Sequence, residues 1–124
     1  MPKILIVEDH ADTQELIRVV LTHAGHDVSV AGDGTEGLER CRADRPDVVV
    51  VDIFMPRLGG IGLIAALRAE TGAATKIIAI SAGWSVRGRD ILQEAARGGA
   101  DRVLRKPLDL DALVATVKDL LPDA

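Results

Sequence analysis

Apolar residues come in short runs along this chain, and the stretches between the runs have the periodicity of helices. Runs of four to six mostly β-branched or aliphatic residues are typical of strands that are buried on both faces of a parallel sheet. Such strands need helices on both faces of the sheet to keep their side chains from water. The pattern predicts five strands, at residues 3–7, 27–31, 47–51, 76–80 and 102–105.

Helical spacing of apolar residues predicts a helix after each of these strands. The five helices are expected at residues 13–24, 35–43, 61–70 and 88–97, and after Asp109, which caps the last one. The alternation of strands and helices predicts an α/β fold, in which helices cover both faces of a parallel sheet.

The length and the charge of the chain restrict its class. Its 124 residues are the length of one domain, so we expect a single domain over residues 1–124. The 15 Lys and Arg against 19 Asp and Glu give a net charge of −4, without the basic clusters that bind nucleic acids directly. The amino terminus has no secretory pattern, and no apolar stretch approaches the ~20 residues of a membrane helix. We therefore expect a cytoplasmic protein that contacts neither nucleic acid nor membrane.

Polar residues follow four of the predicted strands, at the point where each strand ends. Glu8 and Asp9 follow the first strand, Asp52 the third, Ser81 the fourth and Lys106 the fifth. Parallel strands end at the same edge of their sheet, and ligands of open α/β sheets bind outside this edge. The sequence therefore predicts one site that these residues share.

Three carboxylates at one edge would repel one another unless their pKa values rise or a cation neutralises them. Mg²⁺ prefers a few carboxylate oxygens, keeps several waters and commonly bridges to a phosphoryl group. We expect Asp9 and Asp52 to bind Mg²⁺ directly, Glu8 directly or through water, and the backbone carbonyl of Phe54 to complete the shell. Strand-end acids can also be solvated helix caps, but acids together with a lysine and a hydroxyl on separate strands favour a site.

Asp52 is the best candidate nucleophile, because a carboxylate beside Mg²⁺ can attack a phosphoryl group and hold it as an aspartyl phosphate. Lys106 would neutralise one phosphoryl oxygen, and the Ser81 hydroxyl would donate to another. Phosphoryl transfer depends mainly on positioning and electrostatic stabilisation, which these side chains offer.

Together these residues resemble the receiver domain of bacterial two-component response regulators over nearly the whole chain. The resemblance rests on IVEDH, on VVVDIFMP with Gly60 four residues past Pro56, on Ser81-Ala82, and on Lys106-Pro107 after GADRVL. It implies a flavodoxin-like, doubly wound sheet of five parallel strands in the order 2-1-3-4-5 with five helices. It also implies a Lys106-Pro107 bond that is commonly cis.

The resemblance further implies a function in two-component signalling. A sensor histidine kinase or a histidine phosphotransfer protein would donate a phosphoryl group to Asp52. The chain would then catalyse only its own phosphorylation and dephosphorylation, and would not be an enzyme with other substrates. Because the chain ends with the last helix, we expect a stand-alone regulator. Its output would be contact with a target through the fourth helix, fifth strand and fifth helix, or a relay of the phosphoryl group.

Val103 departs from the family pattern, which usually has an aromatic residue three positions before the lysine. Valine is small and stiff about χ1, so it cannot reproduce the swing of a ring. Our hypothesis is that activation instead moves the loop after Ser81 and the fourth helix.

A competing interpretation comes from a GxGxxG pattern at Gly32, Gly34 and Gly37, with Asp52 twenty residues beyond the first glycine. This pattern is typical of dinucleotide-binding folds. Acidic residues at positions 33 and 36 would place negative charge beside a pyrophosphate, which makes this alternative a distant one.

Two further alternatives share the fold but not the chemistry. A Mg²⁺-dependent phosphatase that forms an aspartyl phosphate would often carry a second acid at the position of Phe54. A receiver-like binding module that is never phosphorylated remains open, although every expected site residue is present.

Overall fold

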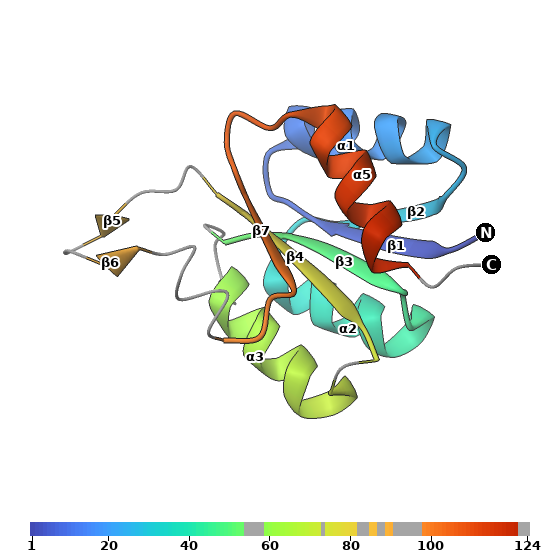
Figure 1. Cartoon of the computed structure of the whole chain (residues 1–124). Helices are drawn as coiled ribbons and strands as arrows, with labels where there is room; N and C mark the ends of the chain where they lie inside the picture. The colour runs from blue at the N-terminus through green and yellow to red at the C-terminus, as the bar shows by residue number, and fades with distance from the viewer. Residues whose placement is uncertain (54–58, 73, 82–84, 87–88, 91–97, 122–124) are drawn as a thin grey trace.

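The computed structural model describes residues 1–53, 59–72, 74–81, 85–86, 89–90 and 98–121, with the backbone alone at the four residues 85, 86, 89 and 90. One central sheet of five strands runs through the molecule (Figure 1). All neighbouring strands in it are parallel, in the order β2-β1-β3-β4-β7, which confirms the expected order. The strands are β1 (Lys3–Val7), β2 (Asp27–Ala31), β3 (Val48–Asp52), β4 (Lys76–Ser81) and β7 (Arg102–Arg105).

Helices cover both faces of this sheet, as the doubly wound prediction requires (Figure 1). Helices α1 (Ala11–His23) and α5 (Leu110–Leu120) lie on one face, and α2 (Gly34–Asp44) and α3 (Gly60–Thr71) lie on the other. None of the helices in the described part of the chain is both long enough and apolar enough to cross a membrane.

The helix predicted at residues 88–97 can be compared with the structure at two positions, Arg89 and Asp90. Most of this range lies outside the described residues, which contain four helices. Within it, β6 (Arg89–Asp90) pairs antiparallel with β5 (Ser85–Val86), so the predicted helix start is wrong at these two positions. Pairing between the two short segments outweighed the helical pattern at these positions.

The core consists of two apolar layers, one on each face of the sheet. Alternate residues of β1 and β3 point into opposite layers, because side chains alternate along a strand. Leu63 and Leu67 of α3 complete one layer, and Ile17 of α1 and Leu113 of α5 complete the other. Fully burying one such side chain stabilises a fold by about 1.5–3 kcal/mol, so this double layer fixes the central strands.

Strand β3 begins and ends one residue later than predicted, at Val48 and Asp52. Asp52 is therefore the last residue of a fully buried strand, and it pairs with Ile80 of β4. The predicted bounds of β1, β2 and β7 agree with the structure, and the helix bounds differ by one or two residues, as is usual for helix ends.

Candidate functional site

The residues that were predicted to share a site lie at the carboxyl edge of the sheet. Glu8 follows β1, Asp52 ends β3, Ser81 ends β4 and Lys106 follows β7. Because β1 and β3 are neighbours in the sheet, Glu8 and Asp52 come from adjacent strands.

Lys106 joins the two buried carboxylates at this edge. Its Nζ atom lies 3.2 Å from Asp52 Oδ2 and 3.5 Å from Glu8 Oε1. Glu8 is fully buried and Asp52 is 4% exposed, whereas the lysine side chain is partly exposed. A cation shared by two carboxylates in a water-poor environment interacts with them far more strongly than a surface ion pair would.

Glu8 has an unusual environment for a carboxylate. Burial, together with the neighbouring Asp52, raises the pKa of Glu8 to about 8, although Lys106 acts in the opposite direction. Its Oε2 atom is buried and has no hydrogen-bond partner among the described residues. A buried oxygen without a partner beside a second carboxylate is a place that a bound cation would satisfy.

An acidic cluster that could hold a metal ion lies at the same edge. Ligand atoms of Glu8, Asp9 and His10 lie within 4.8 Å of one another, and Asp9 and His10 are exposed. The oxygens of Glu8, Asp9 and Asp52 are the donor type that Mg²⁺ prefers, so these residues fit that ion. Phe54, the fourth expected ligand, lies outside the described residues.

Ser81 is buried at the end of β4, with 1% of its surface exposed. Its carbonyl oxygen accepts a hydrogen bond from the backbone N–H of Lys106 at 2.6 Å. The peptide bond between Lys106 and Pro107 is cis, as the resemblance led us to expect. Ala82, which follows Ser81 in the family pattern, lies outside the described residues.

Gly60 packs directly on the backbone that carries Asp52. A Cβ atom at Gly60 would lie 2.5 Å from Ile53 Cα and 2.6 Å from the Asp52 carbonyl oxygen, closer than real Cβ atoms come. The Gly60 N–H donates to the Ile53 carbonyl at 3.1 Å. The start of α3 therefore fixes the end of β3 only if this position has no side chain.

Gln14 is a positioning residue that sequence reasoning missed. Its Nε2 group donates to the carbonyl oxygens of Glu8, at 3.0 Å, and Ala31, at 3.3 Å. The side chain thus ties the ends of β1 and β2 together beside the acidic cluster. A glutamine near the start of a predicted helix looks like an ordinary solvent-facing residue, so no local signal could have identified it.

The glycine-rich stretch at residues 32–37, which suggested dinucleotide binding, makes contacts within the protein that account for its sequence. Glu36 Oε2 accepts from the Gly32 N–H at 3.1 Å, and Asp33 Oδ1 accepts from the Glu36 N–H at 2.9 Å, which caps α2. A Cβ atom at Gly37 would meet Val7 at 2.9 Å. These contacts account for the pattern by helix capping and close packing, and nothing in them supports dinucleotide binding.

The sequence matches the response regulator receiver domain over residues 4–118. The chain belongs to this family. Response regulator MprA of Mycobacterium ulcerans (strain Agy99) is 38% identical over 122 residues, which are 96% of this chain and 50% of that protein. MprA of Mycobacterium tuberculosis (strain ATCC 25177 / H37Ra) shows the same identity and coverage. The receiver chain thus spans about half the length of these curated relatives.

Solved receiver structures agree with this assignment. The chemotaxis protein CheY4 of Vibrio cholerae superposes with a TM-score of 0.87 at 30% identity, covering 98% of this chain and 99% of that one. The receiver domain of the Francisella response regulator 1452 superposes with a TM-score of 0.86 at 32% identity, covering 97% and 96%. The flavodoxin-like receiver fold therefore extends over nearly the whole chain.

Proposed function

We propose that this receiver accepts a phosphoryl group on the carboxylate of Asp52. The supporting observation is the contact of Lys106 with the buried Glu8 and Asp52, in which one ammonium lies within 3.5 Å of two carboxylates from neighbouring strand ends. In the reaction, an Asp52 oxygen forms a bond to phosphorus. The bond from phosphorus to the donor's leaving atom breaks, and its electron pair stays on that atom; for a phosphohistidine donor this atom is an imidazole nitrogen.

Lys106 and Ser81 would stabilise the transferred group. Burial alone would lower the pKa of Lys106, but Asp52 and Glu8 outweigh this effect and raise the pKa above its ordinary value. The side chain therefore stays cationic and can move from the free carboxylates to a phosphoryl oxygen as charge builds there. The Ser81 hydroxyl, at the end of the neighbouring strand, would donate to a second oxygen.

Mg²⁺ would be held by Glu8, Asp9, Asp52 and the carbonyl of Phe54, and when bound it neutralises the negative charge gathered at the carboxylates and the incoming phosphoryl group. The residues contribute the oxygen ligands and hold them at the sheet edge. The burial of Glu8 and its raised pKa support this assignment, because a cation would stabilise the ionised form of that carboxyl.

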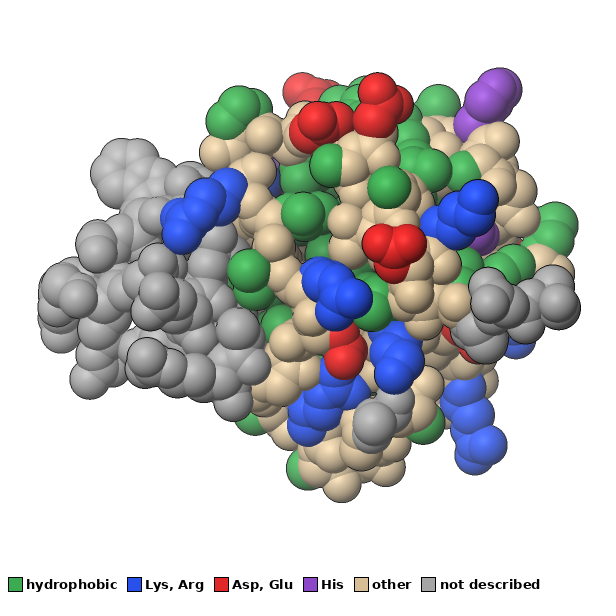
Figure 2. Space-filling view, in the orientation of Figure 1, with side chains coloured by type: hydrophobic (Ala, Val, Ile, Leu, Met, Phe, Trp, Pro, Cys, Tyr) green, Lys and Arg blue, Asp and Glu red, His purple; other side chains and the backbone are tan. Residues whose placement is uncertain are grey.

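The partners are proposed on the basis of the family. The donor would be a sensor histidine kinase or a histidine phosphotransfer protein in the cytoplasm. The target would bind the face formed by the predicted fourth helix, β7 and α5, of which β7 and α5 are described. Figure 2 shows both acidic and basic side chains among the described residues on the side that carries α5. This mixture suits a protein partner better than a nucleic acid.

Intact mass after incubation with acetyl phosphate and Mg²⁺ tests the proposal. We expect one added phosphoryl group, lost with a chelator and lost in Asp52→Asn. Asp119→Asn, which alters an exposed carboxylate on α5, is the matched control and should keep the gain. A gain of mass that persists in Asp52→Asn would refute the assignment of Asp52 as the acceptor. No gain from acetyl phosphate or from phosphorylated kinases would favour the receiver-like binding module.

A further inference from the structure

Strand β7 has few apolar contacts to fix its register. It is a four-residue edge strand that, among the described strands, pairs with β4 alone, and three of its residues are exposed. Leu104 is the residue of β7 that packs against the core. Register is strongly specified where one face of a strand is buried and weakly where it is not. Polar contacts at the ends of β7 must therefore set much of its register against β4.

Asp101, directly before β7, supplies such contacts at the first end. Its backbone N–H donates to the Ile77 carbonyl at 2.8 Å, and its Oδ2 accepts from the Ile77 N–H at 2.8 Å. Both bonds go to one residue of β4. They place Asp101 opposite Ile77, and the next pair of the ladder, Ile78 with Arg102, follows from this placement.

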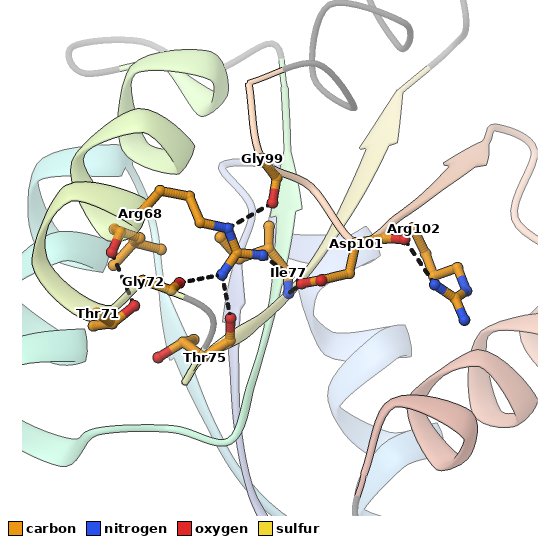
Figure 3. A network of polar contacts seen from close by, with 9 residues as sticks. Arg68, Thr71, Gly72, Thr75, Ile77, Gly99, Asp101 and Arg102 are labelled. Carbon is orange, nitrogen blue, oxygen red and sulfur yellow. Dashed lines mark hydrogen bonds and ion pairs between the residues drawn. The ribbon is translucent and has the colours of Figure 1, made fainter.

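Arg68 of α3 holds the Asp101 carboxylate in this place (Figure 3). Its Nη2 lies 2.5 Å from Asp101 Oδ2, and its Nε donates to the Gly99 carbonyl at 2.7 Å. Its Nη1 donates to the carbonyls of Gly72 and Thr75, each at 2.6 Å. One guanidinium therefore joins the end of α3, the approach to β4 and the approach to β7. We name the Arg68–Asp101 pair the register clamp.

The register clamp is largely shielded from solvent, and Gly99 packs closely against its arginine. Both side chains are largely buried, at 19% and 25% exposure, so solvent screens the pair less than a surface ion pair. Gly99 has φ +122°, and a Cβ atom there would lie 2.5 Å from Arg68 Cγ. A side chain at position 99 would thus be strained and would displace the arginine.

The other end of β7 leads directly into the site. Lys106 donates its backbone N–H to Ser81 and places its Nζ 3.2 Å from Asp52. A slip of one residue along a strand moves the chain by about 3.3 Å and turns each side chain to the opposite face. Such a slip would take the ammonium group out of reach of Asp52.

We propose that the register clamp positions Lys106, so that Arg68 and Asp101 act on the site from the opposite end of β7. The consequence for phosphoryl transfer rests on the proposed function, whereas the position of Lys106 does not. Asp101→Ala removes the acceptor for both Ile77 and Arg68. Arg68→Gln removes the ion pair and the guanidinium hydrogen bonds to backbone carbonyls, but keeps the bonds between Asp101 and Ile77. Arg42→Gln is the matched control, because Arg42 makes a similar pair with Glu70, at 2.7 Å, between α2 and α3.

Crystal structures of these variants test the placement directly. We expect the distance from Lys106 Nζ to Asp52 Oδ2 to exceed hydrogen-bonding reach in Asp101→Ala and Arg68→Gln, and to stay short in Arg42→Gln. If the distance stays short in all three, the proposal is overturned. Should Asp101→Ala not fold, Arg68→Lys is the milder variant, since an ammonium keeps the charge but cannot bind the same four acceptors in a fork.

Phosphorylation rates with acetyl phosphate separate positioning from general stability. We expect a rate loss of about tenfold or more in Asp101→Ala, as for other small misplacements of reacting groups. In a Lys106→Ala background the same change should have no further effect, because the clamp acts through Lys106. An equal loss in both backgrounds would overturn the proposal. If the unaltered chain takes up no phosphoryl group, the proposed function fails, and the crystallographic distance alone decides the inference.

Discussion

Lys106 Nζ lies 3.2 Å from Asp52 Oδ2, although 54 residues separate the two along the chain. Their strands are not neighbours, because β4 lies between β3 and β7. The lysine therefore reaches past the end of β4 to contact Asp52, and it also lies 3.5 Å from Glu8. One side chain directly after an edge strand thus balances the charge of two carboxylates at the ends of β1 and β3.

Replacing Lys106 with Met should slow phosphoryl uptake from acetyl phosphate by about a hundredfold, the effect of losing one preorganised group that stabilises developing negative charge. The time course of intact mass measures this rate. Lys76→Met, at the opposite end of β4, is the control and should leave the rate unchanged. A Lys106→Met variant as fast as the unaltered chain would contradict the role of the ammonium group.

Without metal, the free energy of unfolding should fall as the pH rises from about 4.5 to about 8 through the contribution of Glu8. Its pKa is raised from 4.5 to about 8 in the folded chain, so the folded state binds more protons in this window than the unfolded state. Glu8→Gln should therefore stabilise the chain at pH 8 by about 1 kcal/mol or more, on the scale of one pKa unit, and much less at pH 5. Urea unfolding at the two pH values measures this, and equal effects at both would refute the assignment.

Mg²⁺ should stabilise the folded chain, because the unfolded chain lacks the assembled acidic site. An ion at one hundred times its dissociation constant adds about 2.7 kcal/mol. The effect should be smaller at pH 5, where the Glu8 carboxyl holds a proton that competes with the ion. Thermal unfolding with Mg²⁺ and with chelator measures the shift. Asp9→Asn should reduce the shift, and Asp119→Asn should preserve it; an unchanged shift in Asp9→Asn would exclude Asp9 as a ligand.

Gly60→Ala should destabilise the chain by about 1–3 kcal/mol, the usual cost of overpacking, because the new Cβ would clash with the backbone of Asp52 and Ile53. Gly32→Ala is the control, since its Cβ would meet its nearest neighbour at an ordinary 3.7 Å. Urea unfolding compares the two variants. Equal stability of Gly60→Ala and the unaltered chain would show that the end of β3 can move without penalty.

Most of the strands and helices could be predicted from the sequence, because a strand that is buried on both faces consists of a continuous run of apolar residues. The continuous apolar runs of β1 and β3 and the cap Asp109 belong to single segments, and each can be predicted without knowing its neighbours. The prediction failed at Arg89–Asp90, where pairing with another short segment decided the conformation. It also missed Gln14, whose partners lie on two strands.

The sequence by itself determined which residues stand at the strand ends, since a strand ends where its apolar run meets a polar residue. Only the tertiary structure decided that Glu8 is fully buried, that Lys106 faces both Glu8 and Asp52, and that Asp101 anchors β7 through Ile77. The physical reason is the distance along the chain over which each property is set. Periodicity records the environment of one segment, whereas burial, pKa and register arise from atoms that distant segments bring together, and those depend on the order of strands in the sheet.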